Sequence, residues 1–177
     1  GGSFICEGVV CDPVKADEDA VVRPVASGAV RVATFNCSLN RETAGQLERD
    51  LSTDGDLQAR RVARVLRTVR PDLVLLNEFD FSESGQAAQL FLKNYLAADV
   101  SWSAEPALKY EYWWSGPVNT GVPTGLDLDH DGKTDGPGDA FGFGRFPGQY
   151  GMLLLSKYPI DTARVRTFQK LLWQQMP

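Results

Sequence analysis

The sequence predicts an α/β fold in which helices cover one face of a mixed sheet. Three features carry this prediction. Residues 30–36 form an apolar, alternating run that ends in Asn36, and residues 72–78 form a second run that ends in Glu78. Between them lies an amphipathic, arginine-rich segment that stops at Pro71. Two strands joined by one helix through short connections make a right-handed parallel unit, which brings the carboxyl ends of both strands to one edge of the sheet.

The helix between these strands should begin after Asp54 or Asp56, because either side chain can cap the first turn, and should run to about residue 69. Its apolar residues recur at helical spacing and predict the buried stripe, while its arginines lie mostly off that stripe. We interpret the arginines as a solvated face rather than a nucleic-acid surface. The stripe consists of Val62, Val65, Leu66 and Val69, and the arginines are Arg60, Arg61, Arg64, Arg67 and Arg70.

The rest of the chain adds two helices and three strands to this unit. The helices are expected at residues 43–51 and 86–98, and the strands at residues 110–114, 150–155 and 160–168. Residues 73–76 are apolar throughout, which is typical of a strand covered on both faces. In the longer helix, the expected inner positions are Ala87, Leu90, Phe91, Tyr95 and Ala98.

Length and composition indicate one domain with its own core. Residues 1–28 have no sustained period and are interpreted as a leader. Residues 29–177 form the domain, with a Gly-, Pro- and Asp-rich connection inserted at about 115–149. No apolar run approaches the roughly 18 residues that a membrane span requires. The formal net charge is -5, but residues 126–140 hold five Asp and one Lys, a local charge of -4, so overall acidity does not argue against a phosphate-bearing substrate.

The three cysteines leave the cellular compartment open. Cys6 and Cys11 are spaced for a small local disulfide, which would fit a secreted or periplasmic protein. Two free thiols in a cytoplasmic protein are an equal alternative. Cys37, which follows the first strand, is expected to be a small buried residue rather than a nucleophile.

Asn36 and Glu78 are the main candidates for chemistry. Glu is depleted in strands, so one that ends an apolar run indicates either chemistry or pairing. A carboxylate and an amide oxygen at one sheet edge suit a hard divalent cation such as Mg²⁺. The alternative is a strand-end Glu that faces water beside an Asn that begins a turn.

The sequence around Asn36 and Glu78 resembles that of the endonuclease/exonuclease/phosphatase superfamily. Asn77 stands where the family usually has Gln, which is a mild departure. The resemblance is carried, in the expected order, by residues 31–36 (RVATFN), 58–66 (QARRVARVL), 70–78 (RPDLVLLNE) and 148–160 (GQYGMLLLSKYPI).

The resemblance implies a phosphoesterase that uses Mg²⁺ or Mn²⁺ and a four-layer α/β sandwich of two packed sheets. Carried over by position, Glu78 is a direct metal ligand, and Asn36 positions the attacking water or binds phosphate and metal. Gln149 and Tyr150 lie where the family often places a phosphate-contacting side chain. The substrate would be a phosphate ester, either nucleic acid or a small molecule.

The resemblance also implies that this chain is about half of such a domain. The family takes its general base and remaining ligands from an Asp-x-Asn pair and a terminal Ser-Asp-His, and neither is present here. The only histidine is His130, in the acidic loop. We therefore expect the second half to lie outside this chain, as further sequence or a separate partner chain. These residues alone should be inactive, and strands 30–36 and 72–77 should present an uncovered apolar face.

A second constellation lies in the acidic loop. Asp127, Asp129, Asp131 and Asp135 occupy positions 1, 3, 5 and 9 of a pattern similar to an EF-hand Ca²⁺ loop, with Gly132 at position 6. Gly138 replaces the Glu of position 12, and Asp139 is its available substitute. This pattern supports an alternative function for the chain, that of a non-catalytic Ca²⁺-binding module. The other interpretation of the pattern is a solvated acidic loop that binds no ion. The glycine-rich residues 142–148 follow as a flexible rim, with Arg145 a candidate phosphate contact.

Overall fold

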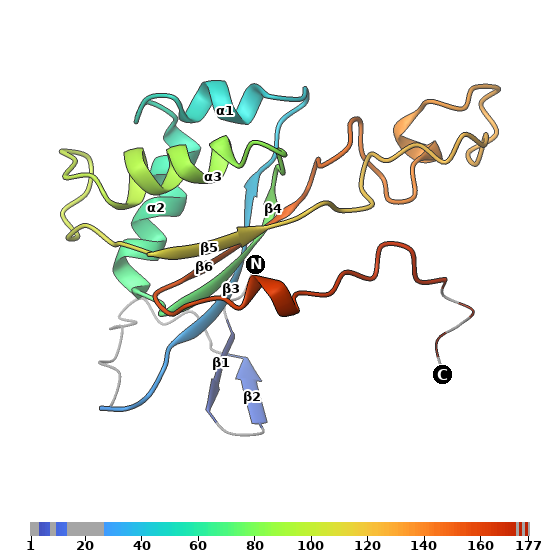
Figure 1. Cartoon of the computed structure of the whole chain (residues 1–177). Helices are drawn as coiled ribbons and strands as arrows, with labels where there is room; N and C mark the ends of the chain where they lie inside the picture. The colour runs from blue at the N-terminus through green and yellow to red at the C-terminus, as the bar shows by residue number, and fades with distance from the viewer. Residues whose placement is uncertain (1–3, 8–9, 14–26, 173, 175, 177) are drawn as a thin grey trace.

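The central element of the fold is a four-stranded mixed sheet (Figure 1). The computed structural model describes residues 4–7, 10–13, 27–172, 174 and 176. The strand order is β3-β4-β6-β5, in which β3 and β4 run parallel and the other two pairs are antiparallel. The predicted mixed α/β arrangement is therefore confirmed. The strands are β3 (Val32–Leu39), β4 (Leu73–Phe79), β5 (Tyr112–Ser115) and β6 (Met152–Ser156).

All the longer helices cover the same face of this sheet, as Figure 1 shows. They are α1 (Gln46–Leu51), α2 (Leu57–Val69) and α3 (Gln86–Phe91), and α3 continues as one π-helical turn, η1 (Leu92–Leu96). Two short 3₁₀ turns, η2 (Pro137–Asp139) and η3 (Thr162–Arg164), lie outside this layer. Between helices and sheet lies an apolar core that includes Leu47, Leu51, Leu66, Val74, Leu76, Phe91, Tyr95, Leu153 and Leu155.

Helix α2 has the ends that the sequence predicts. The side chain of Asp56 accepts a hydrogen bond from the Ala59 amide at 2.7 Å and so caps the first turn. Arg70 closes the helix in the left-handed conformation, directly before Pro71. The predicted stripe is only partly right, because Val65 is 45% exposed whereas Ala59 and Ala63 are buried.

Arg67 departs from the expected solvated arginine face. Its side chain is only 2% exposed, and its guanidinium donates to three backbone carbonyls, one within η1 and two in the segment after it. The acceptors are the carbonyls of Tyr95 at 3.1 Å, Ala98 at 2.5 Å and Glu105 at 3.1 Å. Burial lowers the pKa of this guanidinium. Arg67 therefore fastens α2 to the segment that follows η1.

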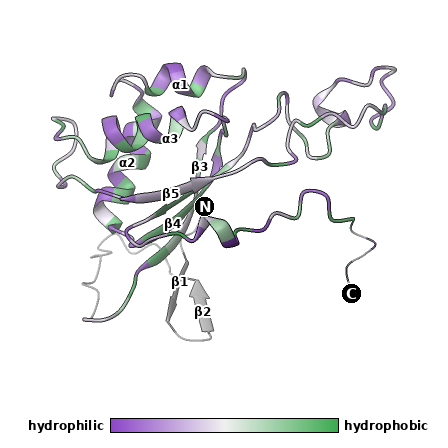
Figure 2. Ribbon diagram, viewed as in Figure 1, coloured by the Kyte–Doolittle hydropathy of each residue, from purple (hydrophilic) through white to green (hydrophobic). Residues whose placement is uncertain are grey.

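The sheet face opposite the helices is uncovered by any described element. Along β4, Val74 and Leu76 are fully buried, whereas Leu73 and Leu75 are half-buried. Strand Leu73–Leu76 is thus covered on one face here, not on both as its apolar run suggested. We call this surface the open face; strand pairing groups on it Val32, Thr34, Leu73, Leu75, Trp114, Met152 and Leu154. The helices on the covered face carry both hydrophilic and hydrophobic residues, which Figure 2 shows as purple and green bands.

Three predicted elements differ from the structure. The expected helix 86–98 is α-helical only to Phe91, and the π turn then rotates the following positions, which buries Leu96. Strand β6 begins at Met152 rather than at residue 150, because Tyr150 adopts a left-handed conformation with φ 56°. The predicted strand 160–168 is wrong: its residues are mostly exposed, they include the 3₁₀ turn η3, and they form no described ladder.

The N-terminal segment contains more structure than the expected leader. Strands β1 (Phe4–Glu7) and β2 (Val10–Pro13) pair antiparallel, with Cys6 opposite Cys11 in the register. The other residues of the expected leader up to 26 lie outside the described part of the chain. A disulfide between Cys6 and Cys11 and export of the protein stay predictions. Cys37 is buried as predicted, and burial raises the pKa of its thiol to about 11. Within the described residues, no helix is both long and apolar enough to cross a membrane.

Candidate metal and phosphoester site

A β-bulge at the carboxyl ends of β3 and β4 forms the candidate site. Asn36 pairs with Asn77 and Leu39 with Phe79, so two residues of β3 lie opposite the single residue Glu78. Both Ser38 and Glu78 adopt left-handed conformations, with φ 49° and 58°. Such conformations cost about 1 kcal/mol or more for a residue with a Cβ and tend to occur where function requires them. Bulges also re-aim side chains beside active sites.

The bulge brings Glu78 to Asn36. Asn36 Nδ2 donates to Glu78 Oε1 at 2.7 Å. The second carboxylate oxygen, Oε2, accepts from Asn40 Nδ2 at 3.2 Å and from Ser38 Oγ at 3.3 Å. Both strand-end residues predicted from the sequence thus meet at one edge, together with two further polar side chains from the end of β3 and the residue after it.

The donor set fits a hard divalent cation. Asn36 is exposed and Glu78 half-buried, so solvent and a substrate can approach. Glu78 supplies one carboxylate, to which the side-chain amides of Asn36 and Asn40 and the hydroxyl of Ser38 donate hydrogen bonds. Mg²⁺ is often held by one or two carboxylates, several waters and substrate phosphate, rather than by a full protein cage. With a single carboxylate, these residues could hold such an ion only with additional oxygen ligands.

Asp80 lies two residues beyond Glu78 and is buried, with 6% of its surface exposed. Its Oδ2 accepts the Arg41 amide at 2.7 Å and its Oδ1 accepts the Tyr150 amide at 3.0 Å. Burial raises the pKa of Asp80 to about 6, although the two amides and the Arg41 charge act in the opposite direction. The carboxylate thus connects the chain after β3 with the chain before β6.

The three residues proposed for substrate contact occupy different environments. Tyr150 is half-buried, and its backbone amide donates a hydrogen bond to Asp80, which holds it close to the bulge. Gln149 is fully buried, and its side chain donates to the Arg41 carbonyl and accepts from the Arg145 amide. In this geometry Gln149 holds loops together. Arg145 is exposed and pairs with Glu42 at 3.0 Å.

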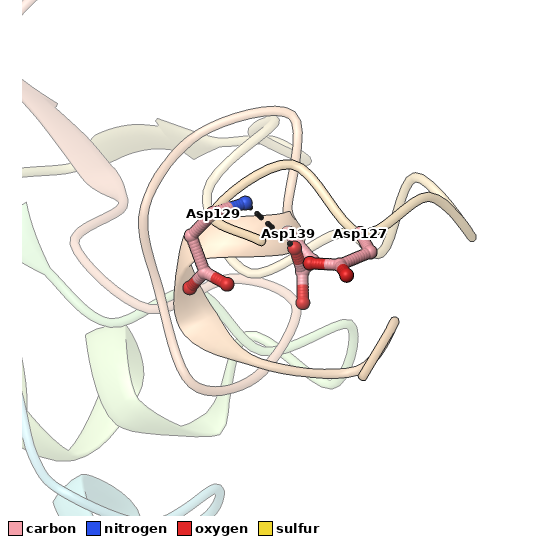
Figure 3. A group of neighbouring side chains, drawn as sticks. All are labelled: Asp127, Asp129 and Asp139. Atoms are coloured by element: carbon pink, nitrogen blue, oxygen red, sulfur yellow. Dashed lines mark hydrogen bonds between the residues drawn. The ribbon is translucent and has the colours of Figure 1, made fainter. Parts of the chain in front are cut away.

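The acidic loop brings three carboxylates together, as Figure 3 shows. Oxygens of Asp127, Asp129 and Asp139 lie within 4.8 Å of one another. Asp139, the residue that could substitute for position 12, therefore takes part. Asp131 and Asp135 are not members of this group among the described residues.

Asp139 also organises the backbone of this loop. Its Oδ1 accepts the Leu128 amide at 2.7 Å and its Oδ2 the Gly136 amide at 3.1 Å. Hydrogen bonds from these amides, led by that of Leu128, lower the pKa of Asp139. His130 lies exposed in the same loop, in a left-handed conformation.

A model of the Endonuclease/Exonuclease/phosphatase family matches residues 33–177. The chain belongs to this family. Proteins of the endonuclease/exonuclease/phosphatase family are generally metal-dependent phosphoesterases or nucleases. The matched region includes β4, β6 and all of β3 except Val32, and therefore every residue of the bulge site.

One solved structure of this family was also found, an endonuclease/exonuclease/phosphatase from Beutenbergia cavernae DSM 12333. It is 25% identical to this chain, with a TM-score of 0.34. The match covers 73% of this chain and 26% of that chain, so the present chain spans about a quarter of that protein's length. A search of curated proteins finds no match.

The sequence did not point to three residues at the bulge site of the present chain: Ser38, Asn40 and Asp80. Each is a polar residue within four positions of Asn36 or Glu78. Their closeness in sequence to Asn36 and Glu78 was visible. The direction of their side chains was not, because the alternation of residues along a strand does not predict a bulge. A polar residue that directly follows a strand end, such as Asp80, was the usable signal.

Proposed function

We propose that this chain contributes the Glu78 metal site of a phosphoester hydrolase that uses Mg²⁺ or Mn²⁺. The observation that carries the proposal is the carboxylate of Glu78, which accepts hydrogen bonds from Asn36, Ser38 and Asn40 at the open end of two parallel strands. Membership of the family, and the strained conformation of Glu78, support it. Glu78 is the direct ligand in this proposal.

The neighbouring side chains fix the carboxylate for this role. Asn36 Oδ1 accepts from the Ser38 amide at 3.1 Å, which orients the Asn36 amide so that its Nδ2 faces Glu78. Ser38 and Asn40 hold the other carboxylate oxygen. Carboxylates oriented by such outer partners bind metals more strongly than free ones. A bound Mg²⁺ or Mn²⁺ would polarise the phosphoryl oxygens and stabilise the leaving oxygen.

The substrate is proposed to lie over the same edge. Tyr150 is joined to this edge through Asp80, and Arg145 offers a guanidinium on the loop that enters β6. The described residues of the bulge include no histidine, since His130, the only one in the sequence, lies in the acidic loop. The groups that move protons are therefore proposed to come from elsewhere in the whole protein or from a partner chain.

The test is hydrolysis of bis-p-nitrophenyl phosphate by the full-length gene product, with Mg²⁺, with Mn²⁺ and with chelator. Glu78→Gln should lower kcat/KM by about 100-fold or more, since even outer-shell changes typically cost 10–100-fold. Glu111→Gln is the matched control, because Glu111 is exposed and precedes β5, at the opposite end of the sheet. Equal activity of the two variants, or activity that persists without metal, would contradict the proposal.

A second candidate function is binding of Ca²⁺ by the acidic loop. The convergence of Asp127, Asp129 and Asp139 favours it, because Ca²⁺ prefers several carboxylate oxygens. Calorimetric titration with CaCl₂ should show weaker binding for Asp129→Asn, and unchanged binding for Asp135→Asn, whose side chain is exposed outside the group. Indistinguishable heats for both variants and the unmodified protein would remove this candidate.

A further inference from the structure

We propose that Asp80 is a positioning residue for the Glu78 site, acting by docking the two loops that flank β4 onto the end of that strand. This inference rests on the proposed function. Each of its carboxylate oxygens accepts one backbone amide from a different loop, that of Arg41 at 2.7 Å and that of Tyr150 at 3.0 Å. Asp80 touches neither Asn36 nor Glu78 in any described hydrogen bond, so its effect would pass through the loops.

The first loop, after β3, carries Asn40. It is held from the helix side by the Arg41 guanidinium, which contacts Asp50 at 2.5 Å and Asp56 at 3.1 Å. Another bond, from Arg41 Nη1 to the Asn40 carbonyl at 2.9 Å, fixes the residue that reaches Glu78. The Arg41 amide itself is held only by Asp80 among the described contacts. Asp80 therefore completes the support of the Asn40 side chain.

The second loop enters β6 through a close approach to β4. The amides of Phe79 and Phe81 donate to the carbonyls of Gly151 and Gly148 at 3.0 and 2.9 Å. A Cβ on Gly151 would lie only 2.8 Å from the Phe79 carbonyl oxygen. Tyr150 lies between these glycines, and its left-handed conformation directs its amide to Asp80. The same carboxylate thus sets the position of Tyr150 relative to Glu78.

The experiment measures Mn²⁺ affinity of the full-length protein by calorimetry. Asp80→Asn should weaken binding about tenfold, in the range usual for outer-shell residues. Asp80→Glu should weaken it as well, because it keeps the charge but displaces both oxygens by one methylene. A role of charge alone predicts no loss for Asp80→Glu, and that result would overturn the proposal.

Asp72→Asn is the matched control. Asp72 also accepts a backbone amide, that of Arg31 at 2.8 Å, but it precedes β4 and lies at the opposite end of the strand. The other oxygen of Asp72 accepts from Lys157 Nζ at 2.8 Å, so this carboxylate also holds two segments together. Its substitution removes the same charge, and affinity should stay within twofold. An equal loss in Asp72→Asn, or no loss in Asp80→Asn, would overturn the proposal.

A double-mutant cycle tests the route through Asn40. Of the residues in the two docked loops, Asn40 is the one that hydrogen-bonds Glu78. The effect of Asp80 on Mn²⁺ affinity should therefore pass through Asn40, so the double variant Asn40→Ala/Asp80→Asn should bind Mn²⁺ little more weakly than the worse single variant. Losses that multiply would contradict this route. If Glu78→Gln binds Mn²⁺ as well as the unmodified protein, the proposed function fails instead. In that case NMR tests the positioning role of Asp80 separately. The signals of the Asn40 side-chain amide should shift in Asp80→Asn and not in Asp72→Asn. Unshifted signals in Asp80→Asn would overturn the positioning role.

Discussion

Two non-glycine residues in left-handed conformations assemble the candidate site. Asn77 lies on the open face with Leu75, so simple alternation would direct Glu78 toward the helices. The bulge at Ser38 and the positive φ of Glu78 turn its carboxylate to Asn36 instead. The sequence pattern predicted that the two side chains share a sheet edge, but it could not predict this geometry because no glycine marks the bulge.

Arg67 gives a prediction at the same scale. Arg67→Met should lower the free energy of unfolding by about 3 kcal/mol, because three carbonyls would lose their donor in a buried place. Arg61→Met, on the exposed side of the same helix, is the control and should change it by less than about 0.5 kcal/mol. Urea unfolding followed by circular dichroism measures both. A cost for Arg67→Met no larger than that for Arg61→Met would show that the carbonyls find other donors.

At the scale of elements, local signals predicted what local physics decides. The Asp56 cap and the stop at Pro71 gave the bounds of α2, and the apolar runs gave β3 and β4. Tertiary context decided the rest. Residues 160–168 have strand composition but find no partner strand among the described residues, and Arg67 is buried because carbonyls beyond η1 need a donor.

The stability of helix α2 should depend strongly on the contacts of its N-cap residue, Asp56. Asp56→Ala removes the cap of the Ala59 amide and the ion pair with Arg41, whose side chain is 10% exposed. The expected loss of unfolding free energy is about 1–2 kcal/mol. Asp56→Asn keeps a cap oxygen and loses the charge, so it should cost less. Urea midpoints measure both, and an equal cost for the two variants would assign the effect to the ion pair rather than the cap.

At the scale of the molecule, the described helices cover one face of the sheet, and several apolar side chains lie on the open face. Val32 is 71% exposed and Met152 41%, with Leu75 and Leu154 half-buried beside them. The resemblance to a two-sheet family implied such a face on these strands, and the second sheet that would cover it stays a prediction. The candidate site lies at one end of that face, since Asn36 follows Val32 and Thr34 along the same side of β3.

The clamp at the opposite end of β4 gives a prediction of pH dependence. Burial alone would raise the pKa of Asp72, but the hydrogen bonds from Lys157 and the Arg31 amide outweigh it and lower the pKa. A carboxyl whose pKa is lower in the folded state stabilises the fold above its unfolded pKa of about 3.9. That contribution is lost as the pH falls through the folded pKa.

Asp72→Asn should therefore be less stable than the unmodified protein at pH 6, and the difference should shrink between about pH 4 and pH 2. Unfolding free energies from urea titrations at each pH measure the difference. A constant or widening gap as the pH falls would contradict the assigned direction of the pKa shift.

The most direct test of the Glu78 metal site is anomalous diffraction from crystals of the full-length protein grown with Mn²⁺. If Glu78 is a direct ligand, an anomalous peak should lie about 2.1 Å from one of its carboxylate oxygens. Mn²⁺ bound only among Asp127, Asp129 and Asp139, with none at Glu78, would contradict it.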